Sequence, residues 1–157
     1  MQIPSKARAV IIGGGVIGCS IAYHLGKLGW KDVVLLERKQ LTCGTTWHAA
    51  GLIAQLRATQ NMTRLAKYSQ ELYFGLEAET GVATGFKRNG SITVALTDER
   101  MEELRRSAAM ARAFGVEIDE ITSGDIAGRY PGLATGDVVG GVWLPKDGQA
   151  DPVNITQ

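Results

Sequence analysis

The chain has 157 residues, enough for one ordinary domain, and is 45% apolar and 21% charged, as is typical of a globular protein. Lysine and arginine are interleaved with aspartate and glutamate and leave a formal net charge of +1, so neither nucleic acid nor an anionic membrane is an expected partner. The two cysteines, Cys19 and Cys43, have no metal-binding or redox spacing; we expect reduced thiols, no metal, and a cytoplasmic compartment of bacterial type.

A strand, a helix and a second strand are predicted at the beginning of the chain. The run ARAVII is a short β-branched segment that ends in glycines, and DVVLLE is a second continuous apolar run. Both suit a parallel sheet that is covered on its two faces. Between them, residues 16–28 carry apolar side chains at helical spacing, and Gly29 fits a C-terminal cap. These three elements predict an α/β fold.

The junction between the first strand and the helix, GGGVIG, fits the pattern G-x-G-x-x-G. Glycine-rich turns are common, but this turn has the preceding strand and the following helix that dinucleotide binding requires. Gly13 would permit the tight turn, Gly15 the close approach of a pyrophosphate, and Gly18 the packing of the helix on the strand. The pyrophosphate would lie on the free amides of the first helical turn, which begins with Val16 and Ile17.

An acidic residue follows the glycine turn at the distance that the pattern requires. Glu37 lies 19 residues beyond Gly18, at the end of the second strand, with Arg38 next to it. A carboxylate there would accept hydrogen bonds from the adenosine ribose and repel a 2′-phosphate, which argues against NADP. The alternative is a glycine-rich turn followed by an unrelated surface glutamate. Because all the parts are in register, we interpret the segment as a dinucleotide-binding unit.

The segment after the acidic residue bears on which dinucleotide is bound. An NAD domain usually continues into another crossover and a third parallel strand. Here the segment RKQLTCGTTWHAAG is polar, is punctuated by glycine and has no strand pattern. Such a loop can run beside an extended cofactor and supply amides and hydroxyls to it. The loop favours FAD, and half of an NAD-dependent dehydrogenase domain remains an alternative.

The rest of the chain alternates helical and strand patterns. We expect an amphipathic helix over residues 61–79, with Leu65, Tyr68, Leu72 and Leu76 on one face, and then two strands around a tight turn at Asn89 and Gly90. A helix capped by Thr97 and ended by Gly115 should follow. The last expected elements are a strand at VEIDEI, a short helix from Ser123 that Pro131 ends, and a strand at VVGGVWLP. Asp151 and Pro152 suit the start of another helix, but only five residues follow Pro152. We therefore expect the chain to be the N-terminal part of a longer protein.

Two long motifs, VIIGGGVIGCSIAYHLGKLGWKDVVLLER and LTCGTTWHAAGL, are followed by LEAETG, NGSITVAL, YPGL and LPKDGQADP. Together they resemble the N-terminal half of the FAD domain of dimethylglycine and sarcosine dehydrogenases, which belong to the D-amino-acid-oxidase-like flavoproteins. The resemblance implies a Rossmann-like FAD-binding half-domain with its flavin-contacting loop in residues 1–60. Residues 61–157 would begin a mixed α+β substrate domain that is incomplete at its C-terminal end.

In this family the histidine of the TWHAAG motif is bonded covalently to the 8α-methyl group of the flavin, and here that residue would be His48. A neutral imidazole nitrogen is nucleophilic, as such a bond requires. The alternative is a packed or surface histidine without the bond, which is what we expect of His24. A redox or second-tether role for Cys43 is a further alternative. The resemblance assigns the other flavin contacts to Gly44, Thr45, Thr46, Trp47, Ala49, Ala50, Gly51 and Leu52.

The resemblance also implies an activity for the complete protein, the oxidation of an N-methylated glycine of the sarcosine or dimethylglycine class by hydride transfer to FAD. Tetrahydrofolate would act only at a separate C-terminal domain. We expect the residues that bind substrate to follow Gln157, so that this fragment alone would be inactive and would self-associate through surfaces exposed by truncation. A eukaryotic homologue would lie in the mitochondrial matrix. The main alternative is a non-catalytic regulatory homologue that keeps the FAD fold.

Overall fold

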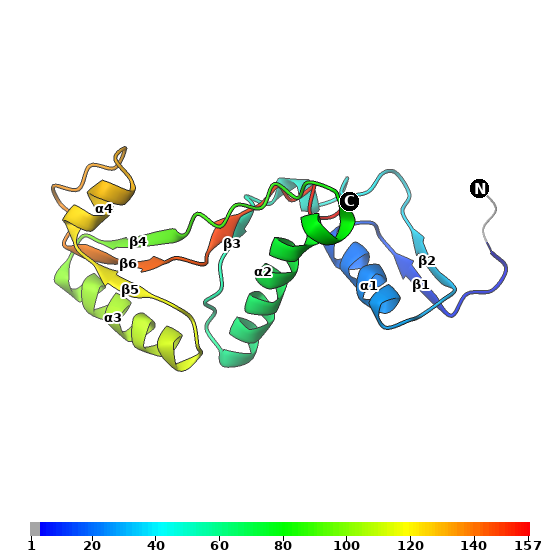
Figure 1. Ribbon diagram of the computed structural model, residues 1–157, viewed down its shortest axis with the longest axis horizontal. Helices are drawn as coiled ribbons and strands as arrows, with labels where there is room; N and C mark the ends of the chain where they lie inside the picture. Colours follow the sequence, from blue (N-terminus) through cyan, green and yellow to red (C-terminus); the bar gives the residue numbers. More distant parts are fainter. Residues whose placement is uncertain (1–3) are drawn as a thin grey trace. The chain divides into compact units, whose positions relative to one another are not determined.

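The computed structural model describes residues 4–157, and Figure 1 shows its helices and strands. These residues form two compact units. Unit 1 consists of the residues up to Gly51 together with 76–85 and 150–157, and unit 2 consists of 52–75 and 86–149. Each unit is therefore assembled from segments that are far apart in the sequence. The division at residue 60 concerns the domains of a complete protein and stays a prediction.

Unit 1 contains the expected strand–helix–strand arrangement. Its elements are β1 (Ala9–Ile12), α1 (Val16–Lys27) and β2 (Val33–Leu36). The strands pair in parallel, from Ala9 opposite Val33 to Ile12 opposite Leu36. Gly29 follows α1 with a φ of 76°, which is the left-handed conformation that ends a helix. The predicted α/β fold of this segment is confirmed.

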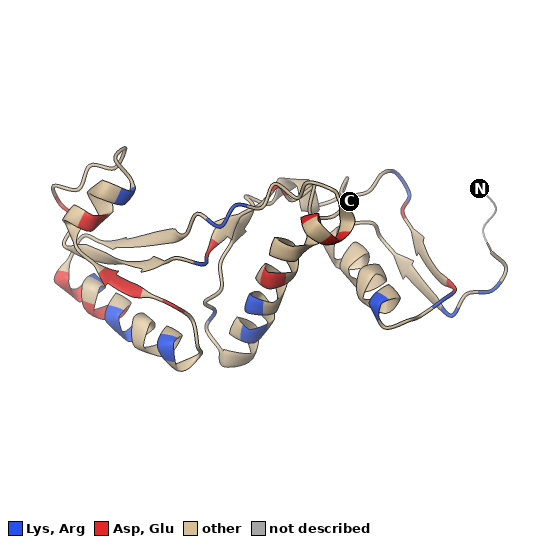
Figure 2. Cartoon of the chain, in the orientation of Figure 1, with Lys and Arg blue, Asp and Glu red and all other residues tan. Residues whose placement is uncertain are grey.

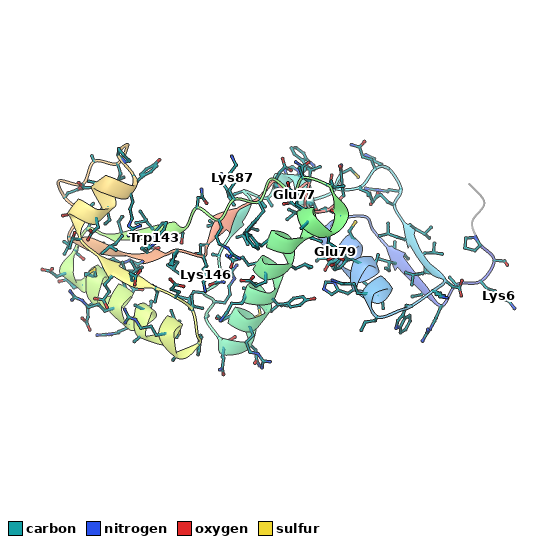
Figure 3. All side chains as sticks on the ribbon, viewed as in Figure 1. Lys6, Glu77, Glu79, Lys87, Trp143 and Lys146 are labelled. Carbon is teal, nitrogen blue, oxygen red and sulfur yellow. The ribbon has the colours of Figure 1, made fainter. Side chains whose placement is uncertain are left out.

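Two later segments of the chain complete unit 1. Glu79, in the last turn of α2 (Gln60–Thr80), accepts a hydrogen bond from the Tyr23 hydroxyl at 2.8 Å and pairs with Lys27 at 3.2 Å (Figure 3). The carboxylate of Asp151 accepts hydrogen bonds from the backbone N–H groups of Val153 and Asn154 at 2.8 and 3.0 Å. Asp151 therefore caps a helical turn, as its position before a proline predicts.

Unit 2 is built around an antiparallel sheet with the strand order β4-β6-β5. Its strands are β4 (Ser91–Ala95), β5 (Asp119–Ile121) and β6 (Gly140–Leu144). Figure 1 shows α3 (Asp98–Ala113) on one side of this sheet and α4 (Ser123–Arg129) on the other. Alternate side chains of β6 divide between the two sides, since Val142 packs with α3 and Trp143 with the cluster around Ile126 of α4. A short pair, β3 (Leu52–Ile53) with β7 (Gly148–Gln149), also belongs to this unit.

Helix α3 is the element of unit 2 that the sequence pattern predicts best. The Thr97 hydroxyl accepts a hydrogen bond from the N–H of Arg100 at 3.2 Å, and Gly115 follows the helix with a φ of 70°. The side chains predicted to face inward are all buried: Met101, Leu104, Ala108 and Ala111. Figure 2 shows charged residues of both signs along the same helix. They form exposed ion pairs, which contribute little to stability, so the apolar face holds α3 on the sheet.

The predicted hairpin around Asn89 and Gly90 is wrong. Strand β4 pairs with β6, and Lys87 forms only an isolated bridge with Gln149. Gly90 does have a positive φ, 75°, but a Cβ atom there would lie 1.8 Å from the Trp143 ring. The glycine therefore makes room for a tryptophan on another strand.

Helix α2 also differs from its amphipathic pattern. It covers Gln60–Thr80, close to the predicted range, but its fully buried side chains are Thr63 and Gln70. Leu65 and Tyr68, which the pattern places on an apolar face, are 57% and 53% exposed. Residues 60–75 of α2 belong to unit 2. Polar contacts contribute more to their packing than the amphipathic sequence pattern predicts.

A buried polar network accounts for those contacts. Asp147 is 2% exposed, and its carboxylate accepts hydrogen bonds from the backbone N–H of Gln55 at 2.9 Å and from the Ser91 hydroxyl at 2.7 Å. The Gln55 side chain donates to Gln70, which in turn donates to the carbonyl of Lys146. The network joins α2 and β4 to the turn that follows β6.

We expect replacement of Asp147 by alanine to lower the free energy of unfolding by about 2–4 kcal/mol, because two buried donors would lose their acceptor. Chemical denaturation followed by circular dichroism measures the change. Asp137→Ala is the matched control, because Asp137 is exposed, and it should change stability by less than about 0.5 kcal/mol. Equal effects of the two substitutions would contradict a stabilising role for the network.

Candidate cofactor-binding site

The glycine turn lies between β1 and α1 and brings their backbones into close contact. Gly13 has a φ of 109°, and its N–H donates to the carbonyl of Leu36 at 2.8 Å. A Cβ atom on Gly18 would lie only 1.9 Å from the carbonyl oxygen of Gly13, so no side chain fits there. Gly15 is the N-cap residue of α1 and provides no side-chain cap. The roles predicted for Gly13 and Gly18 match this geometry.

Gly14, which the motif leaves unspecified, is in close contact with residues of the loop that follows β2. Its N–H donates to Glu37 Oε2 at 2.8 Å, and its carbonyl accepts a hydrogen bond from the N–H of Thr42 at 2.8 Å. A Cβ atom at this position would lie 2.6 Å from the Leu41 side chain. A larger residue there would displace side chains more than twenty positions away, a crowding that only the folded chain reveals.

Glu37 is tied to the glycine turn by its carboxylate. Besides the bond from Gly14, its other oxygen accepts hydrogen bonds from the N–H of Lys39 at 3.0 Å and the thiol of Cys43 at 3.7 Å. The bonds from the Gly14 and Lys39 amides lower the pKa of Glu37 from its usual value. Burial, and next the Glu37 charge, raise the pKa of the Cys19 thiol. A carboxylate has about four acceptor positions, so this one retains capacity for a ribose hydroxyl.

The loop predicted to contact the flavin folds back onto the same turn. Thr42 is 5% exposed and has a φ of 69°, which is unusual for a residue other than glycine. Thr46 is 8% exposed, and its hydroxyl accepts a hydrogen bond from the N–H of Val16 at 3.0 Å. A 3-10 helix, η1, covers Thr46–His48. The structure therefore brings the loop and the first turn of α1 together.

His48 lies at the end of η1 with its side chain exposed. The centre of its ring is 3.7 Å from that of Trp47, and the two planes are inclined by 34°. Ala49 and Ala50 are also exposed. Gly51 has a φ of 78°, and a Cβ atom there would lie 2.2 Å from the carbonyl oxygen of Ala150, so this glycine has a packing role as well. Among the residues predicted to bind the cofactor, Leu52 alone lies in unit 2.

Other features of unit 1 agree with binding of a dinucleotide. Leu41, Cys43 and Trp47 take part in lining an open cavity of about 690 Å³, within the usual size range of ligand sites. The first turn of α1 contains no acidic residue, as an anion at a helix N-terminus requires. The amide predicted to be free at Val16 is bonded to the Thr46 hydroxyl, and that of Gly14 to Glu37. A pyrophosphate would therefore rest on the other amides of this turn.

Two kinds of site are not found in residues 4–157. This range contains no group of three or more His, Cys, Asp or Glu side chains arranged to hold a metal ion. Nor does any helix within it combine the length and apolar character that a membrane span needs.

The contact of Gly18 with Gly13 predicts that the effect of a glycine-to-alanine substitution on stability depends strongly on its position in α1. Gly18→Ala should lower the free energy of unfolding by about 1–3 kcal/mol or more, because the added methyl group overlaps a backbone carbonyl. Gly26→Ala, also in α1, would place its Cβ in open space and should stabilise the chain by up to about 1 kcal/mol. Denaturant titration of the two variants tests this, and a harmless Gly18→Ala would contradict the close approach.

The hydrogen bonds to Glu37 predict that the stability of the fold decreases as the pH falls. Because the pKa of Glu37 is lowered by folding, its stabilising contribution is complete above the unfolded value of about 4.3. That contribution is lost as the pH falls through the lower, folded value. Melting temperatures between pH 3 and 7 should therefore fall less steeply on acidification for Glu37→Gln than for the unmodified chain. Glu77→Gln, at an exposed position, is the control and should leave the slope unchanged.

Comparison with known proteins assigns the chain to a family. The family model described as "FAD dependent oxidoreductase" matches residues 8–157. Mitochondrial sarcosine dehydrogenase of Mus musculus is 40% identical over 151 residues, which are 96% of this chain and 16% of that protein. The 4-methylaminobutanoate oxidase (formaldehyde-forming) of Paenarthrobacter nicotinovorans is 41% identical over 154 residues, which are 98% of this chain and 19% of that protein.

A regulatory protein and a solved enzyme are also similar. The mitochondrial pyruvate dehydrogenase phosphatase regulatory subunit of Mus musculus is 38% identical over 155 residues, which are 99% of this chain and 18% of that protein. The crystal structure of L-proline dehydrogenase from P. horikoshii has a TM-score of 0.91 and 31% identity, over 98% of this chain and 40% of that one. The chain thus spans less than a fifth of the length of these three sequence relatives. It belongs to the FAD-dependent oxidoreductases of the D-amino-acid-oxidase type, as its glycine turn and its histidine loop indicate.

Proposed function

We propose that this chain is the FAD-binding part of an oxidoreductase that acts on an N-methylated amino acid. Two of the relatives, sarcosine dehydrogenase and 4-methylaminobutanoate oxidase, have names that specify N-methyl amines as substrates. The observation that carries the proposal is the attachment of the histidine loop to the glycine turn by the Thr42 and Thr46 hydrogen bonds. One small body thus contains both the pyrophosphate cradle and the residue proposed to bind the flavin ring.

Each part of this body has a role when the cofactor is bound. FAD supplies the two-electron acceptor for oxidation of an amine C–H bond. The amides of the glycine turn that are not bonded to Glu37 or Thr46 would hold the pyrophosphate, and Glu37 would accept hydrogen bonds from the ribose. Ala49 and Ala50, which are small and exposed, allow the backbone to lie against the flavin ring. None of these residues is proposed to contact the amine substrate.

His48 is proposed to carry the covalent link to the flavin. In that reaction His48 loses its ring proton and forms an N–C bond to the 8α-methyl carbon, from which a second proton leaves. The electron pair that is released passes to dioxygen, which takes up the two protons as hydrogen peroxide. The exposed imidazole at the end of η1 is accessible for this reaction, and the ring of Trp47 packs against it.

The test is the intact mass of the natural polypeptide that contains this chain, denatured after expression in a flavin-producing host. We expect a mass increased by one FAD, and we expect the increase to be lost in His48→Ala. The matched control is His24→Ala, on α1, which should keep the added mass. Yellow colour released on denaturation from the unmodified protein would retain FAD binding and contradict the covalent link.

A second candidate function follows from the similarity to a phosphatase regulatory subunit. A non-catalytic homologue could keep this fold and bind FAD without oxidising an amine. Reduction of an artificial dye in the presence of sarcosine, dimethylglycine or 4-methylaminobutanoate distinguishes the two candidates. Dye reduction that depends on one of these amines supports the enzyme, whereas a flavin-loaded protein that none of them reduces supports the regulatory homologue.

A further inference from the structure

Thr46 makes a contact that joins two functional segments of unit 1. Its hydroxyl oxygen accepts a hydrogen bond from the N–H of Val16, the first residue of α1, at 3.0 Å. A side chain that caps a helix usually belongs to the N-cap residue itself. Here the N-cap residue is Gly15, which has no side chain, and the cap comes from a residue 30 positions later. Thr46 therefore satisfies an orphan donor of α1 from a separate loop.

The absence of a side chain at Gly15 leaves the space that this contact needs. A Cβ atom on Gly15 would lie 3.0 Å from the Thr46 hydroxyl oxygen, so even alanine would crowd it. The Thr46 residue is only 8% exposed, and the hydroxyl has no other hydrogen bond among the described contacts of residues 4–157. Thr45, its neighbour, is exposed and its side chain caps nothing. The two adjacent threonines thus differ sharply in environment.

The Thr46 contact also determines where His48 lies. The N–H of His48 donates to the carbonyl of Thr45 at 3.1 Å, and the N–H of Ala49 donates to that of Thr46 at 3.1 Å. These bonds make η1 a compact turn that begins at Thr46 and ends at His48. A second attachment, from the N–H of Thr42 to the carbonyl of Gly14, fixes the preceding part of the loop. The backbone at His48 is therefore positioned relative to the N-terminus of α1.

We propose that Thr46 is a positioning residue for the covalent attachment of the flavin. This inference rests on the proposed role of His48 and adds a residue that acts through it. The pyrophosphate end of the cofactor would rest on the glycine turn, and Thr46, through its bond from the N–H of Val16, sets the position of the histidine loop relative to that turn. Without the hydroxyl, FAD still binds, but the imidazole is misplaced relative to the carbon it must reach. Small displacements of that kind slow reactions strongly.

The experiment compares three variants of the natural polypeptide, prepared free of flavin in a riboflavin-limited host and then mixed with FAD. Thr46→Val keeps the shape and removes the hydroxyl, Thr46→Ser restores a hydroxyl, and Thr93→Val, at an exposed position of β4 in unit 2, is the matched control. Flavin fluorescence quenching gives the affinity for non-covalent FAD. Fluorescence of the protein band on a denaturing gel, sampled over time, gives the rate of covalent attachment.

We expect Thr46→Val to reduce the attachment rate about tenfold or more while its affinity for FAD changes by less than about threefold. Thr46→Ser should recover most of the rate, and Thr93→Val should match the unmodified protein. An unchanged rate in Thr46→Val, beside normal attachment in the unmodified protein, would overturn the role of Thr46 alone. A parallel loss of affinity and rate would overturn it too, since that pattern indicates a damaged site. Absence of covalent flavin from the unmodified protein would overturn both this inference and the proposed role of His48.

Discussion

The close approach of Gly18 to the carbonyl of Gly13 is the constraint on which the rest of unit 1 depends. Because a Cβ atom at Gly18 would lie 1.9 Å from that oxygen, α1 can begin directly beside the end of β1 only with glycine there. This packing directs the N-terminus of α1 toward the carboxyl ends of the two parallel strands. In open α/β sheets that edge is where ligands bind, and in this chain Glu37 and the histidine loop follow from the same edge.

A single residue, Gly14, then organises the site around that edge. Gly14 donates its N–H to Glu37 and accepts a hydrogen bond from Thr42, so the acidic residue and the loop are attached to the same residue. The bond to Glu37 also accounts for the lowered pKa of its carboxyl. The site is thus organised by hydrogen bonds from backbone N–H groups of the glycine turn and its loop, accepted by the Glu37 carboxylate, the Thr46 hydroxyl and a backbone carbonyl.

The sequence alone predicted the parts of this fold that follow from local rules, and it failed where distant residues decide. Thr97 as a helix cap and Gly18 as a packing glycine are properties of short segments with a known geometry. The contacts of Gly14 were not predicted, because they are made with Leu41 and Glu37, which are distant in the sequence. Gly90 suggested a hairpin, although the lack of a Cβ atom at Gly90 makes room for Trp143 of β6. The polar burial of Gln70 likewise depends on partners that no periodicity contains.

The distribution of apolar burial separates the two units. Within residues 4–157, both clusters of buried apolar side chains belong to unit 2, whereas Ile12 and Ile17 of unit 1 are 87% and 74% exposed. In the part of the chain that the structure describes, unit 1 is held by backbone hydrogen bonds and glycine packing, which contribute less than an apolar core does. A ligand that binds only the folded form stabilises it in proportion to the logarithm of ligand concentration over dissociation constant. If unit 1 binds FAD as proposed, cofactor binding would therefore add most to the stability of the unit that contains the glycine turn and His48.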